Sequence, residues 1–483
     1  MVMGISHEDR AVHTFVISDL HISDAENVDT KRPYWKSYKR REMFFDDDFC
    51  RFLAFIEKQS EGPVELVLNG DIFDFDNIVQ LPTDRSQVDW LAKLRGLGSQ
   101  EWMSLFKVNC IIADHQQFFL RLGEFAQRGN RVVFVIGNHD MEVHWESVQD
   151  RIRQALGVKG TDSDPNVRFC SWFYLSEEDT YISHGHQYDG YCSARNLIHP
   201  KIKLGGKAAI RIPFGDLCER YLLNGMGYFN PHATSNYIMS GLEYVLFFFK
   251  YMVRTQPLLL WTWFWSALAT FYTSMRHFLA PPMRDPLEIE NRVNQIANEA
   301  QVTPSVVRQL NALNTPSACW NPLRILRDLW LDRALLFLGM FYFAGQITLA
   351  IKMIVPISFW WFLIPLTLFM PFYFVYSFNV NSTVFKTPLL SEPLAELLVK
   401  ITGCKRVVFG HNHQPESGRV SSAEYLNSGF WSPAYSDPQC TTRIGTQTFV
   451  WISPGDEAGR MGSLWEWPPG KQDPVPFSEG TSL

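Results

Sequence analysis

Hydrophobic and polar positions over the first 200 residues predict strands and helices in alternation. Short runs rich in valine and isoleucine occupy 13–21, 64–75 and 131–140, and each run ends in a polar loop. Longer stretches between them, at 46–59 and 115–130, repeat their apolar residues with helical spacing. Strands that alternate with helices in this way are typical of an α/β domain whose sheet is covered on both faces.

Two later blocks are too apolar for that pattern. Segment 255–275 has no charged residue, and a second block covers 334–351 and 353–378 with Lys352 between its halves. A membrane-crossing helix needs about 20 mostly apolar residues, a length that both halves of the second block approach or exceed. We therefore predict an all-α hydrophobic insert over 236–385 that associates with a membrane. The alternative is a very apolar pair of core helices, or a dimer interface, in water.

The insert divides the α/β pattern into two parts. We predict the first part of one domain at 11–235 and the second at 386–465, followed by a flexible tail at 466–483. The second part contains strand-like runs at 423–435 and 446–454, which would complete the sheets begun before the insert.

Composition narrows the possible partners and the compartment. A net charge of -6 over 483 residues is unlike that of proteins that bind nucleic acid through phosphate contacts, so we expect no nucleic-acid partner. The eight cysteines are scattered without any C-x-x-C pair, which is typical of reduced thiols in the cytoplasm. The N-terminal stretch has no long apolar core of the secretory type, so we expect the catalytic domain to face the cytoplasm.

Residues that could bind a metal follow each strand-like run, and ligands gather beyond the carboxyl ends of strands in such sheets. Oxygen and imidazole donors without cysteine suit manganese, iron or zinc and argue against a structural zinc. Seven donors divided between two ions leave positions for water and substrate, and a carboxylate can bridge ions about 3.5–4 Å apart. In chain order the strand ends present Asp19, His21, Asp71, Asn138, His139, Asp140, His184, His186, His411 and His413.

The motifs DLH, NGD, GNHD, HGH and GHNH stand in the order of the calcineurin-like metallophosphoesterase superfamily, which the sequence resembles over 13–200 and roughly 400–430. The resemblance implies a two-sheet β-sandwich flanked by helices and hydrolysis of phosphate esters. It implies two metal ions, of which one would be held by Asp19, His21 and His413, the other by Asn138, His184 and His411, with Asp71 as the bridge.

The same resemblance implies how the site would act. Two divalent ions, manganese as the first expectation and iron or zinc as alternatives, would acidify a shared water to a hydroxide that attacks phosphorus. His139 matches a family position near the phosphate and the leaving group, where it could donate a proton. We expect Asp140 to orient His139. The structural alternative for His139 is a hydrogen bond within a tight loop.

The remaining histidines carry weaker signals. His186, the last residue of HGH, does not match a ligand of the family, so we expect it near the substrate or in support of the ligands. The other histidines have no motif around them and are interpreted as surface or locally hydrogen-bonded residues. They are His13, His115, His144, His199, His232 and His277.

The loop 24–44 follows the first strand end and interleaves basic with aromatic residues. Beside a phosphoesterase centre, such a loop could hold a phosphate or an anionic lipid head group. Arg32, Arg40 and Arg41 are the residues that we expect to bind it. A solvated charged loop is the alternative.

The ligand order also limits the membrane topology. Two predicted ligands follow the insert and the others precede it, so both ends of the insert must lie on one side of any membrane and the number of crossings must be even. Arginines in the connector 276–333 favour the cytosolic side. The second block then becomes a hairpin turning near Lys352 or Pro356, and the first an in-plane or re-entrant helix pair broken near Pro257.

Within the superfamily, DLHISD, NGDIFDF, GNHD and HGHQYD look nearest to the UDP-2,3-diacylglucosamine pyrophosphohydrolase branch, which acts at the cytosolic membrane face. Those enzymes commonly have arginine in place of His139 and lack an insert of this size. We predict a membrane-associated dinuclear-metal hydrolase of phosphoester or pyrophosphate bonds in a lipid-linked substrate, with the lipid bilayer as a partner. The alternatives are a tethered phosphodiesterase or phosphatase of a soluble nucleotide and a non-catalytic membrane scaffold, although a scaffold has no need of the intact ligand set.

Overall fold

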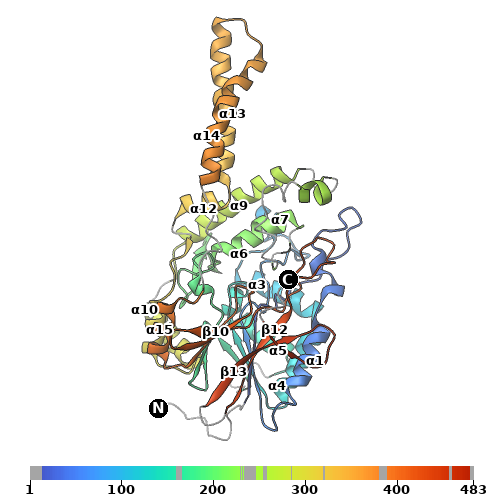
Figure 1. Cartoon of the computed structure of the whole chain (residues 1–483), viewed down its shortest axis with the longest axis vertical. Coiled ribbons are helices and arrows are strands. Elements are labelled where there is room, and N and C mark those ends of the chain that lie inside the picture. The colour runs from blue at the N-terminus through green and yellow to red at the C-terminus, as the bar shows by residue number, and fades with distance from the viewer. Residues whose placement is uncertain are drawn as a thin grey trace.

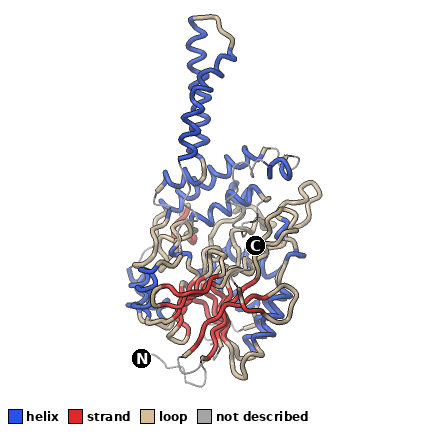
Figure 2. Tube along the Cα trace, viewed as in Figure 1, coloured by secondary structure: helices blue, strands red, loops and turns tan. Residues whose placement is uncertain are grey.

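Two β-sheets face each other in the computed structural model, and helices cover their outer faces (Figure 1). The strands gather in one layered block below a long helical hairpin (Figure 2). Within the described residues, the predicted two-sheet sandwich flanked by helices is confirmed. The structure describes residues 13–158, 166–228, 230, 232, 246–253, 258–283, 286–318, 321–379, 389–455 and 459–478.

The larger sheet joins the two parts of the chain. β1 pairs in parallel with β2 and antiparallel with β12, so a strand from beyond the predicted insert lies beside the first strand. The tail predicted from residue 466 begins later, because 466 lies in β13 and β14 pairs with that strand. In sheet order the described strands are β14 (Val475–Pro476), β13 (Arg460–Trp467), β12 (Gln447–Pro454), β1 (Thr14–Ile17), β2 (Glu65–Asn69), β3 (Arg131–Val135) and β4 (Val167–Cys170).

The second sheet repeats this joining of distant segments. β6 and β9 pair in parallel although more than 200 residues separate them, as in the register Thr180 with Arg406. A separate hairpin is formed by β7 (Lys201–Leu204) and β8 (Lys207–Ile210). In sheet order the described strands are β10 (Glu416–Val420), β11 (Ala423–Asn427), β9 (Arg406–Phe409), β6 (Thr180–Ser183) and β5 (Phe173–Ser176).

The central strands are buried on both faces, as their unbroken apolar runs predict. In β1, Val16 belongs to the core between the sheets, whereas Phe15 and Ile17 belong to the core under the helices. α1 and α4 lie on one side of the sandwich, and α10 and α15 lie on the other (Figure 1). The covering helices are α1 (Asp46–Ile56), α3 (Glu101–Asp114), α4 (Gln116–Gln127), α5 (Glu146–Ala155) and α15 (Glu392–Thr402).

The predicted insert is not one unit in the structure. α10 (Pro286–Glu299) and α11 (Pro304–Asn311) pack into the main core of the α/β domain. Val293, Ile296 and Ala297 on α10 are at most 2% exposed, because apolar residues at this spacing form one face of a helix. The boundaries predicted at 235/236 and 385/386 lie outside the described residues.

α9 (Leu259–Leu279) lies across the domain at the base of the hairpin (Figure 1). Its small residues Ser266, Ala267 and Thr270 are 0% exposed against the domain, while Leu260 and Trp261 are 79% and 59% exposed. This arrangement is that of an amphipathic helix with an apolar outer face. The break predicted near Pro257 lies outside the described residues, between α9 and the short η8 (Phe248–Met252).

The hairpin consists of α13 (Leu331–Ile354) and α14 (Leu363–Asn379). In the described part of the chain, helices over Leu331–Ile354 and Phe359–Asn379 are long and apolar enough to cross a membrane, and few of their residues are buried. The turn after α13 contains Pro356, as predicted. Two candidate spans form an even number, and the side of the membrane on which the domain lies stays a prediction.

Short elements connect the strands and the longer helices, and η10 joins α13 to α14. They are η2 (Ser37–Lys39), η3 (Arg41–Met43), α2 (Trp90–Arg95), η4 (Met141–His144), η5 (His186–Tyr188), α6 (Phe214–Cys218), η6 (Glu219–Leu223), α7 (Asn224–Met226), α12 (Pro322–Asp328) and η10 (Phe359–Phe362).

Candidate dinuclear metal centre

The seven predicted ligands follow strands β1, β2, β3, β6 and β9 and meet at one edge of the sandwich. His413 Nε2 lies 3.1 Å from Asp19 Oδ1 and 3.2 Å from His21 Nε2. On the other side, His184 Nε2 lies 3.0 Å from Asp71 Oδ2. The donor atoms form one group of Asp19, His21 and His413 and another of Asp71, His184 and His411. Other sets also lie close enough to share an ion, among them His21 with Asp71 and His139, so the division between two ions stays a prediction.

Asp71 lies between the two groups. Its Oδ2 is 3.0 Å from His184 Nε2 and 4.0 Å from His21 Nε2, and its Oδ1 accepts a hydrogen bond from the His139 backbone N–H at 2.9 Å. Burial raises the pKa of Asp71, but the imidazoles of His184 and His139 bring it well below the usual value. The ionised carboxylate that results is suited to bridging two cations.

The backbone is strained at five of the seven ligands. Left-handed backbone conformations are uncommon outside glycine and gather at functional sites, where the surrounding structure holds them in place. These loops turn sharply at the strand ends so that their side chains point inward. The residues and φ values are Asp19 (54°), His21 (47°), Asp71 (51°), His411 (72°) and His413 (57°).

Three motif glycines allow the loops to approach one another. A Cβ at Gly137 would lie 2.3 Å from Asp71 Oδ1, and one at Gly410 would lie 2.6 Å from Asp19 Oδ2. A Cβ at Gly70 would lie 2.5 Å from the His184 ring. The glycines of NGD, GNHD and GHNH are therefore required by close packing between the ligand loops.

The hydrogen bonds of the histidines direct their Nε2 atoms into the centre. His184 Nδ1 lies 2.9 Å from the Asn69 carbonyl, and His413 Nδ1 lies 3.1 Å from the His232 carbonyl. Each Nδ1 therefore carries a hydrogen, and each Nε2 faces the carboxylates. Burial lowers the pKa of His184, but Asp71 and Asp19 raise it to about 9. A proton or a metal ion on Nε2 would satisfy the facing carboxylate, so this donor set fits bound metal.

The side chain of Asn138 also fits a bound metal ion. Its amide Nδ2 donates to Asp216 Oδ1 at 2.9 Å, which fixes the orientation of the group. Its Oδ1 is buried and has no hydrogen-bond partner among the described residues. A buried acceptor without a donor is costly, and a metal ion beside His184 would satisfy it.

His139 is surrounded by carboxylates, of which the sequence analysis did not identify Asp76, Asp216 and Glu219. Burial lowers the pKa of His139, but Glu219, Asp71 and Asp216 together raise it well above its usual value. The distances from Nδ1 are 3.5 Å to Asp76, 3.6 Å to Glu219 and 3.7 Å to Asp74, and Nε2 is 3.7 Å from Asp216. The imidazole is therefore held in its protonated form.

The predicted role of Asp140 needs correction. Its carboxylate accepts hydrogen bonds from the backbone N–H groups of Ile72, at 2.9 Å, and Gly137, at 2.5 Å. Both oxygens are thus used to tie the loop after β2 to the loop after β3. Burial raises the pKa of Asp140 to about 7. Asp140 supports the ligand loops, while other carboxylates surround His139.

A buried chain of charges extends from His139 into the domain. Arg220 Nε donates to Asp76 Oδ1 at 2.8 Å, and Arg220 Nη2 donates to Glu142 Oε1 at 2.9 Å. Lys107 Nζ donates to the same Glu142 oxygen at 2.6 Å. These groups are at most 2% exposed, so the chain fixes Asp76 beside His139.

Two further histidines reach the centre. The sequence predicts a surface or locally hydrogen-bonded residue at His232. In the structure its ring lies 4.1 Å from that of His21, and its Nε2 lies 3.7 Å from Asp74 Oδ2. His186 is 1% exposed with its ring 5.6 Å from that of His184, and neither nitrogen has a hydrogen-bond partner among the described residues. No sequence motif surrounds His232, so its position beside His21 could not be predicted from the sequence.

The basic loop differs from the predicted phosphate grip. Arg41 pairs with Asp114, Arg40 donates to the Pro33 carbonyl, and Arg32 lies 4.3 Å over the Trp35 ring. None of these contacts reaches the metal centre, so the substrate roles of Arg32, Arg40 and Arg41 stay predictions.

Two lysines of the same loop are buried instead. Lys39 pairs with Asp24 and donates to the Asn77 carbonyl at 2.7 Å. Lys36 donates to the side chains of Asn77, at 3.0 Å, and Asn224. The loop is thus fixed to the domain by its lysines, while Arg32 and Arg41 on the same loop are exposed, as the alternative of a solvated loop predicts.

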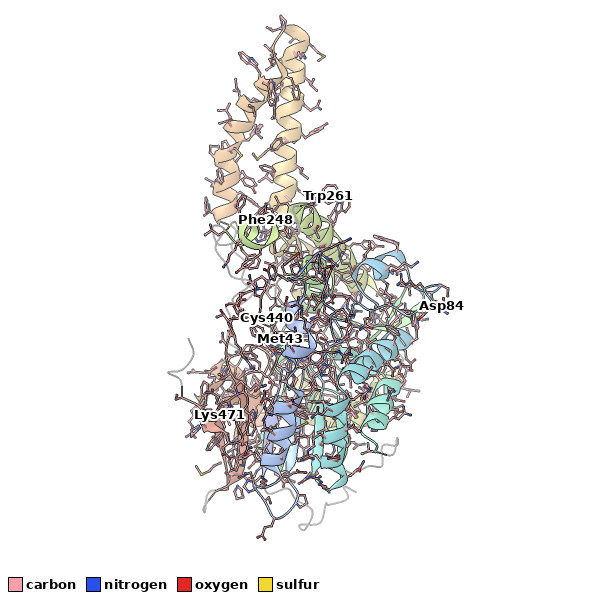
Figure 3. The ribbon with its side chains drawn as sticks, turned by 90° about the vertical axis from the view of Figure 1, so that its right-hand side faces the viewer. Met43, Asp84, Phe248, Trp261, Cys440 and Lys471 are labelled. Atoms are coloured by element: carbon pink, nitrogen blue, oxygen red, sulfur yellow. The ribbon has the colours of Figure 1, made fainter. Side chains whose placement is uncertain are left out.

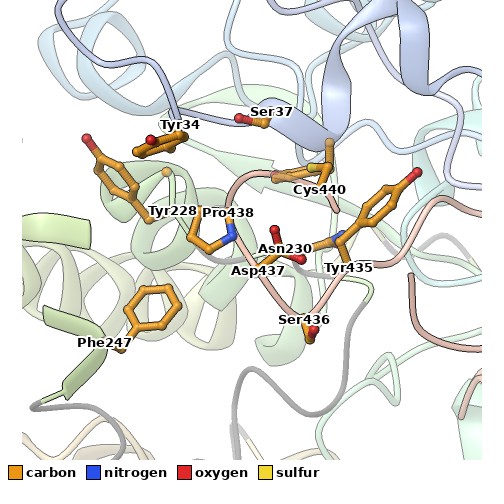
Figure 4. Close-up of a pocket in the computed structure, with 12 residues that line it drawn as sticks. Tyr34, Ser37, Tyr228, Asn230, Phe247, Tyr435, Ser436, Asp437, Pro438 and Cys440 are labelled. Carbon is orange, nitrogen blue, oxygen red and sulfur yellow. The ribbon is translucent and has the colours of Figure 1, made fainter. Parts of the chain in front are cut away.

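A cavity lies between the basic loop, the segment before α9 and the loop between β11 and β12 (Figure 4). Tyr34, Tyr228 and Phe247 form one side, and Asn230 and Asp437 lie on the other (Figure 4). Tyr38, another lining residue, has its ring 6.0 Å from the ring of His232. The lining contains none of the seven predicted ligands, and it includes Phe247 of the helical segment that precedes α9.

Residues 12–203 match the calcineurin-like phosphoesterase family. The matched range includes the ligands from Asp19 to His184, while His411 and His413 lie beyond it. Comparison with curated proteins gives no match. This part of the chain is thus similar to a calcineurin-like phosphoesterase domain, and the similarity supports metal-dependent hydrolysis of phosphoesters.

Proposed function

We propose that the protein is a membrane-associated, dinuclear-metal hydrolase of phosphoester or pyrophosphate bonds in a lipid-linked substrate. The convergence of two donor groups on Asp71 carries this proposal. A scaffold protein would gain nothing from five strained ligand backbones and a buried, unpaired Asn138 carbonyl.

The chain's own residues supply two sites of similar chemistry. Asp19, His21 and His413 would hold one ion, Asn138, His184 and His411 the other, and Asp71 would bridge them. Two divalent ions, with manganese as the first choice for this oxygen and imidazole set, would provide an acidified water and screen the phosphate charge. Asp189 Oδ2 lies 3.2 Å from His411 Nε2, which leaves Nδ1 of that ring for the metal.

His139 is the proposed proton donor to the leaving oxygen. Its imidazolium is stabilised by Asp76, Asp216 and Glu219, and its backbone N–H fixes the bridging carboxylate of Asp71. A charged donor next to the bridging group also suits the doubly negative phosphate of the transition state.

Access from the membrane supports a lipid-linked substrate. Phe247, which lines the cavity in Figure 4, precedes α9 and its exposed apolar face. Figure 3 places Phe248 and Trp261 together at the base of the hairpin. A substrate whose acyl chains stay in the bilayer would approach the centre from this side.

The substrate we favour is a pyrophosphate-linked lipid at the cytoplasmic face, as in the UDP-2,3-diacylglucosamine pyrophosphohydrolase branch that the motifs resemble. The arginines of the segment between α9 and α13 support the cytoplasmic side. His139, in place of the arginine common there, favours a substrate whose leaving group needs a proton.

The test is a hydrolysis panel with the full-length protein in uncharged detergent and manganese. Lipid pyrophosphates, lipid phosphomonoesters and soluble nucleotide esters are compared by kcat/KM. We expect the highest value for a lipid-linked substrate. A preference for a soluble nucleotide would replace the lipid assignment by that of a tethered nucleotide phosphoesterase.

Asp71→Asn tests the catalytic assignment, with Asp84→Asn as the matched control because Asp84 caps an exposed turn through Ser86. We expect Asp71→Asn to lose manganese-dependent hydrolysis with its fold retained by circular dichroism. Unchanged hydrolysis in Asp71→Asn would refute the bridging role.

A further inference from the structure

A second cavity, of about 370 Å³, opens where the basic loop meets α2, α7 and α9. It is separate from the cavity in Figure 4, although Tyr228 lines both. Its lining residues are Arg32, Trp35, Leu94, Arg95, Asn224, Gly225, Tyr228 and Thr262. A cavity of this volume is within the range of small-ligand sites.

Arg95 gives this cavity a positive charge without a negative partner. Its guanidinium donates to Ser266 Oγ at 2.9 Å and to the Leu94 carbonyl at 3.2 Å, both of which are neutral groups. None of the ion pairs among the described residues includes Arg95, and burial lowers its pKa. Arg32, which stacks on Trp35 at 4.3 Å and pairs with Asp29 through Nε at 2.9 Å, adds a second guanidinium at the rim.

Tyr228 offers an unused hydrogen-bond donor in the same cavity. Its side chain is 4% exposed, and its hydroxyl has no hydrogen-bond partner among the described residues. A buried hydroxyl usually finds an acceptor. Together with two guanidinium groups, it makes a donor set that matches the oxygens of a phosphate.

Two glycines, Gly225 in α7 and Gly227 directly after it, leave room for side chains that line the cavity. A Cβ at Gly225 would lie 3.0 Å from Arg95 Cζ and 2.6 Å from Ser266 Oγ. A Cβ at Gly227 would lie 2.4 Å from the Trp35 ring. The sequence NGMG therefore provides the space in which the arginine and the indole lie.

The mouth of the cavity combines this polar interior with an apolar border. Leu94 and Trp90 on α2 are 62% and 69% exposed, and Leu258, just before α9, is 67% exposed. Trp261, next to the lining residue Thr262, lies at the base of the hairpin (Figure 3). Exposed tryptophan and leucine beside arginine are typical of the membrane interface, where lipid phosphates lie.

We propose that this cavity binds the phosphate of an anionic phospholipid headgroup at a site separate from the metal centre. The apolar border favours a lipid over a free phosphate, because acyl chains would cover Leu94 and Trp261. The proposal rests on the membrane association in the proposed function and not on hydrolysis. It also gives Arg32 a binding role away from the metals.

Isothermal titration of the full-length protein in uncharged detergent tests the site. The probes are dioctanoyl phosphatidylglycerol, dioctanoyl phosphatidylcholine and glycerol 3-phosphate. We expect phosphatidylglycerol to bind about tenfold or more tightly than either of the others. Arg95→Gln should weaken that binding about tenfold or more, and the isosteric Tyr228→Phe should weaken it severalfold. Arg419→Gln, an exposed arginine on β10, is the matched control and should bind as the unmodified protein does.

Four results would overturn the proposal. These are equal affinity for phosphatidylglycerol and phosphatidylcholine, equal affinity for glycerol 3-phosphate, unchanged affinity in both Arg95→Gln and Tyr228→Phe, and loss of lipid binding in Asp71→Asn. The last result would place the lipid phosphate at the metals. Retained lipid binding in an Asp71→Asn protein without hydrolysis supports two separate sites. Failure of the unmodified protein to hydrolyse any ester would overturn the proposed function alone.

Discussion

The α/β domain and the hairpin distribute polarity in opposite ways. The domain buries ionisable groups such as Asp71, His184, Lys107 and Arg220 at 2% exposure or less, whereas the hairpin exposes Trp360 at 72%. Each arrangement is costly in water alone. The comparison teaches that each region calls for a different surrounding: the domain pairs its buried charges internally and leaves donor groups that fit cations, whereas the exposed apolar helices of the hairpin are long and apolar enough to cross a membrane.

Removal of the hairpin should have the largest effect of the changes considered. The quantity that changes is the fraction of the protein bound to membranes. Tyr376 Oη donates to Asp332 Oδ2 at 2.7 Å, so the two ends of the hairpin lie close enough for a short Gly/Ser linker to replace it. We expect the shortened protein to lose most of its detergent-dependent membrane fraction while retaining manganese-dependent hydrolysis of a small soluble ester.

Fractionation by centrifugation, with salt and detergent washes, measures the change. A linker of equal length inserted at the exposed turn near Asp84 is the control. Full retention of the shortened protein in the detergent-dependent fraction would assign the anchor to α9 and not to the hairpin.

Gly137→Ala should have the largest effect on catalysis among conservative changes. The added Cβ would lie 2.3 Å from Asp71 Oδ1 and 2.5 Å from its backbone nitrogen, so the bridging carboxylate must move. A displacement of about 1 Å at a reacting centre costs about 100-fold in rate. The measurement is kcat together with bound manganese.

Gly418→Ala in β10 is the control for that change, because a Cβ there meets nothing within 4 Å. Equal kcat values for the two alanine variants would show that the close approach of the ligand loops is not needed for catalysis.

Arg220→Met should be the most destabilising of the remaining changes. It leaves the buried carboxylate of Asp76 without its guanidinium and removes one of two cations from Glu142. Breaking such a buried pair costs about 3–5 kcal/mol. Thermal unfolding in detergent should show a lower Tm, with Arg419→Met, on an exposed strand, within error of the unmodified protein.

The sequence predicted that the seven candidate ligands lie close together, because each follows a strand-like run at a place where topology brings strand ends together; that they bind metal stays a prediction. The groups around His139 were not predictable in this way. Asp216 and Glu219 lie on α6 and η6, and they reach His139 only because this segment packs against α9. The packing of α10 on the main core was missed for a similar reason, since its neighbours in sequence are the most apolar in the chain.

Ala267→Leu tests how tightly α9 packs against the domain, and the same change on the exposed hairpin gives the comparison. Ala267 is 0% exposed between α9 and the domain, so a larger side chain must displace its neighbours at a cost of about 1–3 kcal/mol. Ala350→Leu is the same change on an exposed position of the hairpin and should leave Tm unchanged. Equal Tm values would mean that α9 is held loosely against the domain.

Lys36 should give the smallest effect, which appears as a dependence of stability on pH. Unlike Lys39 and Lys107, it faces amide oxygens, those of Asn77 and Asn224, and burial followed by the charge of Lys39 lowers its pKa to about 7. Above pH 7 the folded state has lost this proton while the unfolded state keeps it to about pH 10.5. Stability linked to Lys36 therefore rises with pH between these values, by at most about 1.4 kcal/mol per pH unit.

Lys36→Met should reduce the rise in unfolding free energy between pH 7 and 9. Lys58→Met, at an exposed lysine, is the control and should not change that rise. Equal slopes in the unmodified protein and both variants would show that Lys36 stays charged when buried.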